Sequence, residues 1–386
     1  MSTRVAKSQT RLGSVALSSA KPGDRILDLD TPALLVDLDR MERNIHRWQA
    51  AMGQRGVKFR PHIKTHKVPE IAQMQMAAGA SGIICAKVSE AEPFAAVGIK
   101  DICIAYPVFG ESKWDRMAAL AAQGVRIRVN CDNEVAARGL SKAAIPAGAS
   151  IKVQIDLDTG MHRGGVPSSD IRSIERLART IAELPGLEFD GITTYRSLSY
   201  EGAPSPGDAG YDEGRIMVQV AERLRSAGIE VREVSAGSTP TAKYVAEVPG
   251  ITEARAGTYV FNDLMQLATG ATEEEIALSI LCTVVSRNDL HRLTVDGGSK
   301  TFSGDRPGGS QGGVIARAAG RKIFIERLSE EHGVARIEGD SAELGEKILF
   351  IPYHVCTCVN LSDELVGFRG NRVEAVWPVV ARGLRA

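Results

Sequence analysis

The sequence predicts an α/β protein with two parts, a (β/α)8 TIM-type barrel and a following antiparallel β domain. From residue 57 to residue 259, eight short β-rich runs alternate with amphipathic, helix-like stretches. Strands that alternate with helices favour a parallel sheet with right-handed crossovers, and eight of them within one domain favour a closed barrel over an open sheet. Near residue 270 the helical stretches almost cease, which predicts a separate, β-rich domain.

The predicted elements follow one another in a regular order. The barrel strands are expected at 57–62, 81–87, 101–107, 125–130, 150–156, 190–195, 231–237 and 253–259. Helix-like stretches at 67–80, 89–98, 170–186 and 211–228 lie between them, and several end in glycine, as is common after a helix C-terminus. The runs 276–287, 292–298, 334–340, 347–359 and 364–380 are expected to form the β domain.

The start of the chain is expected to contribute to both parts. The run 31–39 predicts a strand that joins the β domain, and a helix over 40–54 then leads into the barrel. We therefore predict a flexible N-terminus over residues 1–25, a barrel over 26–268 that leaves out the strand 31–39, and a β-rich C-terminal domain over 269–386.

Composition points to a small-molecule partner. The 386 residues include 47 basic and 47 acidic side chains, so no net charge favours nucleic acid or an anionic membrane. No apolar run approaches the roughly 20 residues that span a bilayer, and the first 25 residues lack an apolar secretory core. The six sparse cysteines fit reduced thiols better than a disulfide framework. We expect a cytoplasmic protein that binds neither nucleic acid nor membranes.

The stretch "RPHIKTHK", residues 60–67, places five basic or titratable side chains at the end of the first predicted barrel strand. Active sites of such barrels lie at the C-terminal ends of the strands. On a strand, His62, Lys64 and His66 would share one face, so Lys64 could project into the barrel mouth. Neighbouring cations should lower the pKa of this lysine and make its amine able to form a Schiff base. The alternative is a solvent-exposed basic loop.

A second set of polar residues stands in "PYHVCTCVNL", residues 352–361. His354 and Cys356 are two positions apart on a predicted strand, so they would share a face and offer an imidazole and a thiolate to a divalent metal ion. A buried histidine and cysteine without a metal is the alternative that this spacing leaves open.

Nearly the whole chain resembles the D-threonine aldolase and D-serine dehydratase family of fold-type III, alanine-racemase-like enzymes that use pyridoxal 5'-phosphate (PLP). The similar segments are "RPHIKTHK", "AKVSEAE", "VSAGSTPT", "AGTYVFND", "VDGGSK", "SEEHG" and "PYHVCTCVNL". The resemblance implies that Lys64 holds PLP and that His62 lies beside the cofactor. It also implies that Arg163 in "DTGMHRGGV" faces the cofactor's ring nitrogen. A guanidinium cannot protonate that nitrogen, so the cofactor would be a weaker electron sink.

PLP also requires a site for its phosphate. "AGSTPT" combines small and hydroxylated residues at the end of the seventh predicted strand, just before a helix, where backbone N–H groups favour an anion. Together with the resemblance, this predicts a phosphate cradle of Gly237, Ser238 and Thr239, joined by Gly257, Thr258 and Tyr259 at the end of the eighth strand. A simple helix cap is the alternative.

For His354 and Cys356 the resemblance implies a catalytic metal site with open positions for water and the substrate's 3-hydroxyl. A thiolate favours zinc, and such an open site would also accept manganese, cobalt or magnesium. One stretch departs from the dehydratase pattern: "TTYRSLSY" has Tyr195 and Leu198 where many dehydratase-like members have histidines. Tyr195 is therefore a candidate contact of cofactor or substrate, whereas Arg196 could bind a substrate carboxylate or only stabilise the strand end.

The resemblance implies a lyase that acts on D-3-hydroxy amino acids. Our first prediction is retro-aldol cleavage to glycine and an aldehyde, and the alternative is a dehydratase that yields a 2-oxo acid and ammonia from D-serine or D-threo-3-hydroxyaspartate. An amino-acid racemase, with Tyr353 as the second base and no metal, is a third reading. A PLP carrier without turnover would lack residues 270–386. By analogy with the family we also expect a homodimer.

Overall fold

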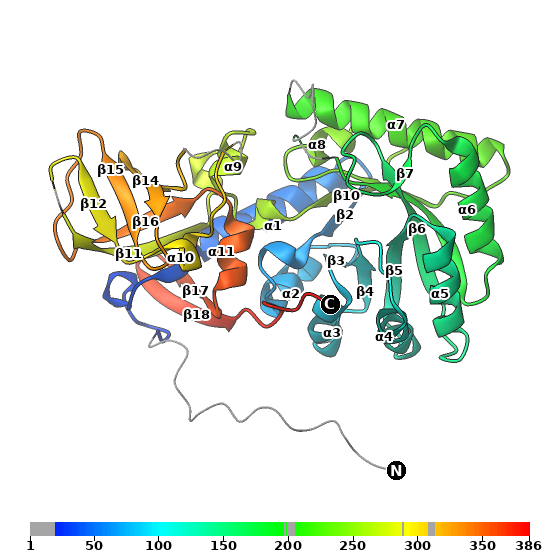
Figure 1. The fold of residues 1–386 in the computed structure, drawn as a ribbon, viewed down its shortest axis with the longest axis horizontal. Helices are drawn as coiled ribbons and strands as arrows, with labels where there is room; N and C mark the ends of the chain where they lie inside the picture. The colour runs from blue at the N-terminus through cyan, green and yellow to red at the C-terminus, as the bar shows by residue number, and fades with distance from the viewer. Residues whose placement is uncertain (1–19, 197, 199–204, 288, 308–312) are drawn as a thin grey trace, which may run out of the picture.

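A computed structural model describes residues 20–196, 198, 205–287, 289–307 and 313–386. It shows a barrel of parallel strands and a separate β domain beside it (Figure 1). The predicted fold class is confirmed. In the part of the chain described, no helix is long and apolar enough to cross a membrane.

The barrel contains eight main parallel strands in the order β2-β10-β9-β8-β6-β5-β4-β3. A bridge between His62 and Ile84 joins the two ends of this order, so the barrel is nearly closed. Its strands are β2 (Lys58–Pro61), β3 (Ile83–Cys85), β4 (Asp101–Ile104), β5 (Arg126–Cys131), β6 (Ile151–Asp158), the short β7 (Val166–Pro167) beside β6, β8 (Leu187–Thr194), β9 (Glu233–Ala236) and β10 (Glu253–Ala256).

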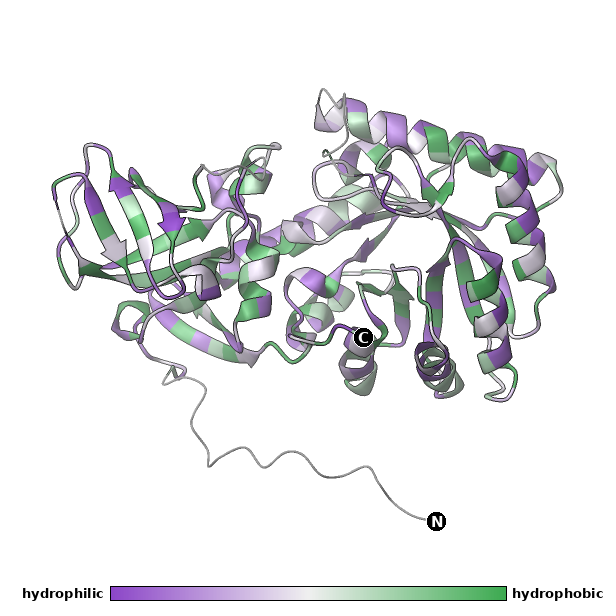
Figure 2. Cartoon of the chain, in the orientation of Figure 1, coloured by the Kyte–Doolittle hydropathy of each residue, from purple (hydrophilic) through white to green (hydrophobic). Residues whose placement is uncertain are grey.

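Helices surround this barrel, and the longer ones bury one apolar face each, whereas the last of the series buries only Gln266. They are α1 (Leu38–Gly53), α2 (Pro69–Ala77), α3 (Val88–Ala96), α4 (Glu111–Ala122), α5 (Glu134–Ala144), α6 (Ile171–Glu183), α7 (Pro206–Ser226), α8 (Ala242–Val245) and α9 (Leu264–Leu267). In α6 the buried residues Ile174, Leu177, Ala178 and Ile181 recur at helical spacing, and the carboxylate of Asp170 accepts a hydrogen bond from Ser173 N–H at the N-cap. Figure 2 shows the same alternation of polar and apolar residues around the outer helices.

In the described part of the chain, the β domain is a sheet of nine strands in the order β12-β15-β14-β13-β16-β11-β1-β17-β18, in which β12 also pairs with β11. The pairing of β12 with β11 closes six of the strands into a small barrel. The strands are β1 (Ala33–Asp37), β11 (Leu278–Ser286), β12 (Arg292–Val295), β13 (Ala316–Ala318), β14 (Ile323–Leu328), β15 (Gly333–Ile337), β16 (Lys347–Pro352), β17 (Glu364–Arg369) and β18 (Arg372–Pro378), with the short helices α10 (Ser299–Phe302) and α11 (Val355–Leu361).

The start of the chain belongs structurally to the β domain. β1 pairs antiparallel with β11 and parallel with β17, in line with the expectation for the run 31–39. Residues 1–19 of the predicted flexible N-terminus lie outside the described residues. Residues 20–25 correct that prediction, because Gly23 N–H donates to the Val373 carbonyl (2.8 Å) and Arg25 bridges to Arg372. The domain bounds 26–268 and 269–386 stay predictions.

The floor of the barrel, near the N-terminal ends of its strands, is charged and buried. Arg128 contacts Glu253 (3.1 Å), Glu233 (3.4 Å) and Asp190 (2.8 Å). Arg60 binds Glu253 from the other side (2.8 Å). Lys58 also binds Glu233 (2.5 Å), and Lys152 binds Asp190 (2.9 Å). Buried charges of this kind are stable only when paired, so these side chains form one layer of paired charges beneath the site.

Candidate active site

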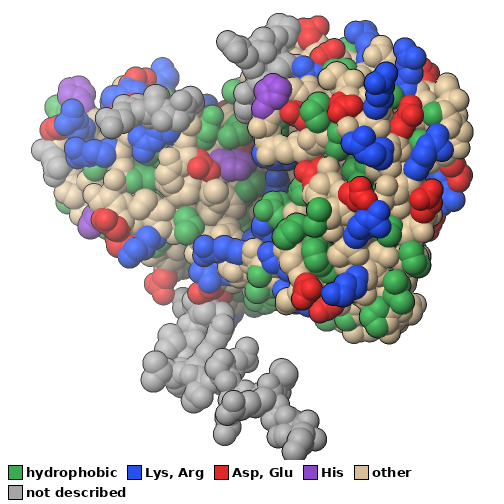
Figure 3. Space-filling view, turned by 45° about the vertical axis from the view of Figure 1, so that its right-hand side comes forward, with side chains coloured by type: hydrophobic (Ala, Val, Ile, Leu, Met, Phe, Trp, Pro, Cys, Tyr) green, Lys and Arg blue, Asp and Glu red, His purple; other side chains and the backbone are tan. Residues whose placement is uncertain are grey.

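The site residues predicted in the barrel follow the C-terminal ends of its strands, on the side that faces the β domain, and His354 and Cys356 belong to α11 of the β domain. Figure 3 shows a hollow where the two domains meet, with basic and histidine side chains along it. The 3-10 helix η2 (Ile63–Thr65), which follows β2, lies against α11 of the β domain. Functional groups of both domains therefore meet here.

Lys64 lies in a turn, and the prediction that it stands on a strand is wrong. β2 ends at Pro61, and Lys64 is the middle residue of η2. The Nδ1 atom of His62 accepts a hydrogen bond from Lys64 N–H (3.3 Å) and so fixes the start of the turn. The Lys64 side chain remains only partly buried, as a lysine that binds a ligand requires.

His62, Lys64 and His66 consequently do not share one face. His66 is fully buried, with its ring 6.5 Å from the rings of Phe94 and of Phe261. Burial lowers the pKa of His66 to about 4, so this side chain is a neutral core residue at physiological pH. His62 stays close to Lys64, and burial, followed by the charges of Lys64 and Arg255, holds the pKa of His62 well below its usual range.

The other two cations of "RPHIKTHK" point away from the site. Arg60 belongs to the barrel floor, and Lys67 Nζ lies 3.1 Å from the Glu90 carboxylate and 2.7 Å from Asn360 Oδ1 of α11. Arg60 and Lys67 are each paired with a carboxylate, so the five basic or titratable residues of "RPHIKTHK" do not form one basic patch. Lys67 instead connects the barrel to the β domain.

Tyr195 and Arg163 gather in front of Lys64. The Nζ atom of Lys64 lies 5.6 Å from the centre of the Tyr195 ring, and the guanidinium carbon of Arg163 lies 4.8 Å from the same centre. Cations attract the face of an aromatic ring at such distances. Three residues predicted from separate segments of the sequence are thus brought together in one row.

Asp158 shapes the loop that presents Arg163. Its Oδ1 atom accepts hydrogen bonds from three successive backbone N–H groups, and its Oδ2 atom lies 3.0 Å from Nδ1 of His162. The three donors are Gly160 (2.9 Å), Met161 (3.0 Å) and His162 (3.0 Å). Because one carboxylate satisfies the whole turn, the loop conformation before Arg163 is well defined.

The first predicted phosphate turn follows β9. Gly237 has a positive φ of 100°, and a Cβ at this position would come within 2.9 Å of the Ala242 backbone, so glycine is required. Ser238 N–H donates to Oγ1 of Thr241 (3.0 Å), which fixes the turn. Thr239 stands next in the same turn and is partly exposed.

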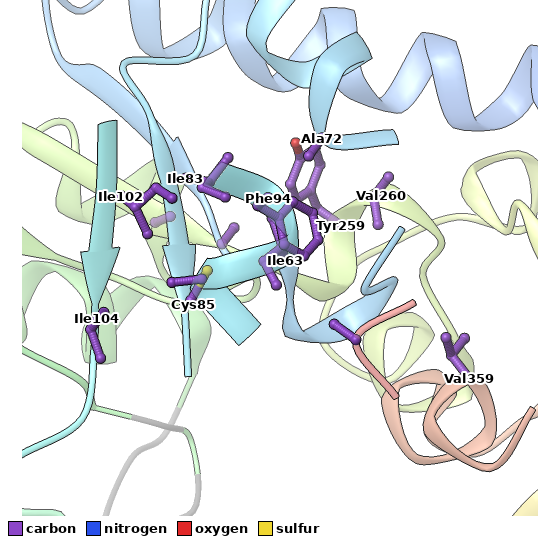
Figure 4. Packing of buried hydrophobic residues seen from close by; sticks show 14 of the residues in the cluster. Ile63, Ala72, Ile83, Cys85, Phe94, Ile102, Ile104, Tyr259, Val260 and Val359 are labelled. Carbon is purple, nitrogen blue, oxygen red and sulfur yellow. The ribbon is translucent and has the colours of Figure 1, made fainter. Parts of the chain in front are cut away.

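Gly257, Thr258 and Tyr259 form the second predicted part of the cradle. A Cβ at Gly257 would lie 3.0 Å from Oγ1 of Thr65 and 3.1 Å from the His62 carbonyl, so this glycine allows the end of β10 to approach the Lys64 turn. The Tyr259 side chain turns away into the core, where its hydroxyl accepts a hydrogen bond from Gln75 (2.9 Å) (Figure 4). Only the main chain of Tyr259 can therefore serve the site.

His354 and Cys356 do not lie on a strand, which corrects the sequence prediction. β16 ends at Pro352, and His354 is the N-cap of α11, whose first turn contains Cys356. Asp263 explains this geometry: its Oδ2 atom lies 3.1 Å from Nδ1 of His354 and accepts a hydrogen bond from Val355 N–H (3.0 Å). The chain therefore turns into a helix, while Nε2 of His354 is left for another partner.

The two residues nevertheless interact with each other and with the Lys64 turn. Burial opposes the charged His354 imidazole, but Cys356 and Asp263 outweigh it and raise its pKa to about 11. Burial likewise opposes ionisation of Cys356, but His354 and then Lys64 lower the pKa of this thiol. The Sγ atom of Cys356 lies 3.2 Å from Oγ1 of Thr65, the residue that follows Lys64, so the thiol lies beside the Lys64 turn of the same chain.

Arg196 is engaged in the structure of the barrel rim. It is buried, and its guanidinium pairs with Asp212 of α7. These contacts favour the structural reading of Arg196 over a contact with a substrate carboxylate. The remainder of "TTYRSLSY" includes residues 197, 199 and 200, which lie outside the described residues.

Sequence reasoning missed several carboxylates that shape the site, namely Asp158, Glu213 and Asp263. Asp263 stands in the segment "AGTYVFND", so its motif was noticed without its role. Glu213 lies within a helix, and no local pattern distinguishes it from a surface glutamate, although it is fully buried. Their partners are far away in the sequence, so only the fold reveals them.

The residues present fit both PLP and a metal ion. PLP needs an amine, a cation near its ring and small or hydroxylated residues for its phosphate, and Lys64, Arg163 and the turn around Ser238 supply these groups. For the metal, Asp263 orients the His354 ring as carboxylates commonly do for ligand histidines. Within the described residues, no cluster of three or more His, Cys, Asp or Glu could hold a metal, so a metal bound here would have His354 and Cys356 as its protein ligands.

Comparison with known proteins agrees with this arrangement. Residues 36–264 match the family described as alanine racemase, N-terminal domain, and residues 277–368 match a serine dehydratase domain. A D-threonine aldolase of an Arthrobacter species is 35% identical over 97% of this chain and 99% of its own length. The D-threo-3-hydroxyaspartate dehydratase of a Delftia species is 36% identical over 86% of this chain and 92% of its own length.

The solved structures give the same result. The crystal structure of a D-threonine aldolase from Filomicrobium marinum superposes with a TM-score of 0.86 at 33% identity, covering 95% of this chain and all of its own. Two structures of a D-threo-3-hydroxyaspartate dehydratase each carry one alanine substitution, one at a histidine and the other at a cysteine two positions later. The structure with the altered cysteine is described as metal-free. With these matches over nearly its full length, the chain belongs to the alanine-racemase-like family of PLP enzymes that includes the D-threonine aldolases and D-serine dehydratases.

Proposed function

We propose that this protein is a PLP- and metal-dependent lyase that cleaves a D-3-hydroxy amino acid to glycine and an aldehyde. The observation that carries the proposal is the meeting of two groups of residues at one barrel mouth. Lys64, Tyr195 and Arg163 form one group, and Cys356, 3.2 Å from Thr65, belongs to the other. A substrate held near Lys64 would therefore have its 3-hydroxyl beside the metal ligands.

Bound PLP would withdraw electrons from the substrate's α-carbon, which is the chemistry that this cofactor supplies. His354 and Cys356 would hold the metal ion, whose charge lowers the pKa of a coordinated hydroxyl. Lys64 would hold the cofactor before substrate arrives, with Arg163 near the ring and the turns at Gly237–Thr239 and Gly257–Thr258 around the phosphate. Tyr195 would limit the space between amine and guanidinium and so orient the substrate.

The fate of one proton separates this reaction from its alternative. Loss of the 3-hydroxyl proton leads to cleavage of the Cα–Cβ bond, and a proton then added to Cα gives glycine. Removal of the Cα proton by the Lys64 amine instead leads to loss of hydroxide, and water then hydrolyses the eliminated product. The second path makes the protein a dehydratase that forms a 2-oxo acid and ammonia. The His-x-Cys arrangement favours this alternative, since a D-threo-3-hydroxyaspartate dehydratase has been altered at residues of the same types and spacing.

The test is a product assay on enzyme supplied with PLP and manganese or zinc. D-Threonine, D-serine and D-threo-3-hydroxyaspartate are incubated separately, with L-threonine as the stereochemical control. Glycine with an aldehyde supports the aldolase, and ammonia with a 2-oxo acid rejects it in favour of the dehydratase. Conversion of a D-amino acid to its L-form that survives complete metal removal would instead identify a racemase.

Three further properties belong to this proposal. Zinc is the metal that a thiolate prefers, and manganese, cobalt or magnesium would also fit so few protein ligands. The proposal also includes a homodimer and a cytoplasmic location, both of which are expected from the sequence. Size-exclusion chromatography with light scattering and metal analysis of the purified protein test the first two points.

A further inference from the structure

One fully buried carboxylate behind the barrel mouth has no part in the proposed chemistry. Glu213 of α7 is 0% exposed and lies between the ends of two neighbouring strands, β8 and β9. Its Oε1 atom accepts a hydrogen bond from Gly237 N–H (3.1 Å) and another from Arg196 N–H (3.2 Å). A single oxygen atom therefore holds the backbone of two separate turns.

The second oxygen of Glu213 reaches the same phosphate turn by another route. Oε2 accepts a hydrogen bond from the Thr241 hydroxyl (3.2 Å), and this hydroxyl oxygen in turn accepts from Ser238 N–H (3.0 Å). The Ser238 hydroxyl also lies 2.9 Å from it. The backbone donors of Gly237 and Ser238 are thus oriented, directly or through one hydroxyl, by Glu213.

The turn after β8 is fixed from the same helix. Arg196 N–H donates a hydrogen bond to Glu213, and the Arg196 side chain forms an ion pair with the neighbouring Asp212. Tyr195, the residue just before, carries the ring that stands between Lys64 and Arg163. Two adjacent acidic residues of α7 therefore hold the backbone next to this ring.

We propose that Glu213 is a positioning residue that couples the phosphate turn of Gly237–Thr241 to the Tyr195–Arg196 turn, so that the cofactor's phosphate and ring are held at a fixed separation. This inference rests on the proposed function and deepens it, since it gives the phosphate subsite its support. Glu213 itself does not touch the cofactor. It acts through Gly237, Thr241 and Arg196.

The choice of residue supports a role as acceptor. All three of its partners are donors, and a buried N–H group that loses its acceptor is costly, because no water replaces the lost bond. Burial raises the pKa of Glu213 to about 7, while the Gly237 N–H and the charge of Arg255 oppose that rise. A glutamine could keep its carbonyl oxygen on the two backbone donors, whereas an alanine could satisfy none of the three partners.

The experiment compares the affinity of the apoenzyme for PLP with its affinity for pyridoxal, which lacks the phosphate. The ratio of the dissociation constant for pyridoxal to that for PLP reports the phosphate subsite alone, and a general loss of stability does not move it. We expect E213A to reduce this ratio by about 10-fold or more, the order that a lost buried hydrogen-bond acceptor implies. E213Q should restore most of the ratio found in the unaltered protein.

The matched control is Met217→Ala, one helical turn further along α7 and equally buried. M217A opens a cavity in the same helix interface without touching either turn, so it should lower the melting temperature and leave the ratio unchanged. If E213A does not fold, E213M, which fills the space but accepts no hydrogen bond, takes its place. A ratio in E213A or E213M equal to that of the unaltered protein overturns the inference. Failure of the unaltered protein to bind PLP would overturn the proposed function instead.

Discussion

The Sγ atom of Cys356 lies 3.2 Å from the Oγ1 atom of Thr65, although 291 positions separate the two residues in the sequence. Thr65 follows Lys64 directly, and Cys356 stands in the first turn of α11 in the β domain. The contact brings the predicted cofactor lysine and the predicted metal ligand of one chain into the same site. A functional barrel mouth therefore depends on the docking of the β domain, which the sequence could not show.

The two lysines of "RPHIKTHK" should have separable roles. K64A is expected to abolish the yellow absorbance of covalently bound PLP, since no other residue of the stretch offers an amine to the site. K67A is the matched control, because Lys67 is paired with Glu90 and Asn360. We expect it to keep the absorbance and to lower the melting temperature by weakening the contact between domains. An absorbance spectrum of K64A that retains the band would show that the lysine is wrongly assigned.

Replacement of Asp263 should weaken metal binding although Asp263 does not contact the metal. One carboxylate oxygen of Asp263 accepts a hydrogen bond from Gln266 N–H, and the other accepts from Val355 N–H beside Nδ1 of His354. In D263N an NH2 group replaces one of these oxygens, so one of the two N–H donors loses its acceptor. An amide donor beside Nδ1 also favours the His354 tautomer with its proton on Nε2, the nitrogen that a metal requires. Loss of such an orienting carboxylate typically costs 10- to 100-fold in affinity. Competition with a chromogenic chelator measures this loss for zinc.

The control for that measurement is D305N. Asp305 accepts a hydrogen bond from Thr357 (2.8 Å) of α11, the helix that His354 caps, but does not contact His354. D305N therefore tests the removal of a nearby negative charge alone. We expect at most a few-fold change in zinc affinity for this variant. Equal losses in D263N and D305N would mean that charge, and not the orientation of the His354 ring, determines the affinity.

The sequence predicted the fold class because each part of it has a local signal. The amphipathic pattern of α6 and the alternation of strands with helices are readable without any partner. Lys64 was predicted from its place after a strand that ends at the barrel mouth, together with the family resemblance. Arg163 and Tyr195 were predicted from the resemblance, and the structure places both near Lys64.

The errors have one physical cause, which is that long-range contacts decide where a strand ends. The run 347–359 reads as one strand, but Asp263 accepts the Val355 N–H and starts a helix there. The strand predicted at 57–62 stops at Pro61, and the 3-10 helix that holds Lys64 follows His62. Glu213 was missed for the same reason, because its partners come from turns that only the closed barrel brings together.

Stability should depend on pH through Glu213. Its pKa is raised to about 7 from a usual value of 4.5, so the folded protein holds the proton more tightly than the unfolded chain does. The resulting stabilisation is complete below pH 4.5 and is lost as the pH rises through 7, a change on the order of 3 kcal/mol. The melting temperature of the unaltered protein relative to that of E213Q should therefore fall between pH 5 and pH 8. A constant difference across this range would contradict the raised pKa.

Arg60 should prove to be a structural residue although it stands four positions before Lys64. Its guanidinium is 2% exposed and binds Glu253 (2.8 Å) and Asp101 (2.6 Å) in the floor of the barrel. R60M would leave these carboxylates with fewer cations, and the removal of one member of a buried ion pair costs about 3–5 kcal/mol. We expect a large fall in melting temperature together with a PLP absorbance that is retained below the transition.

The matched control for Arg60 is R55M. Arg55 forms a partly exposed ion pair with Glu247 (2.6 Å), and such surface pairs contribute about 1 kcal/mol or less. R55M should therefore change the melting temperature by only a degree or two. If R60M instead lost PLP at an unchanged melting temperature, Arg60 would belong to the cofactor site. The assignment of Arg60 to the barrel floor, Lys64 to the reactive amine and Lys67 to the contact between domains would then be wrong.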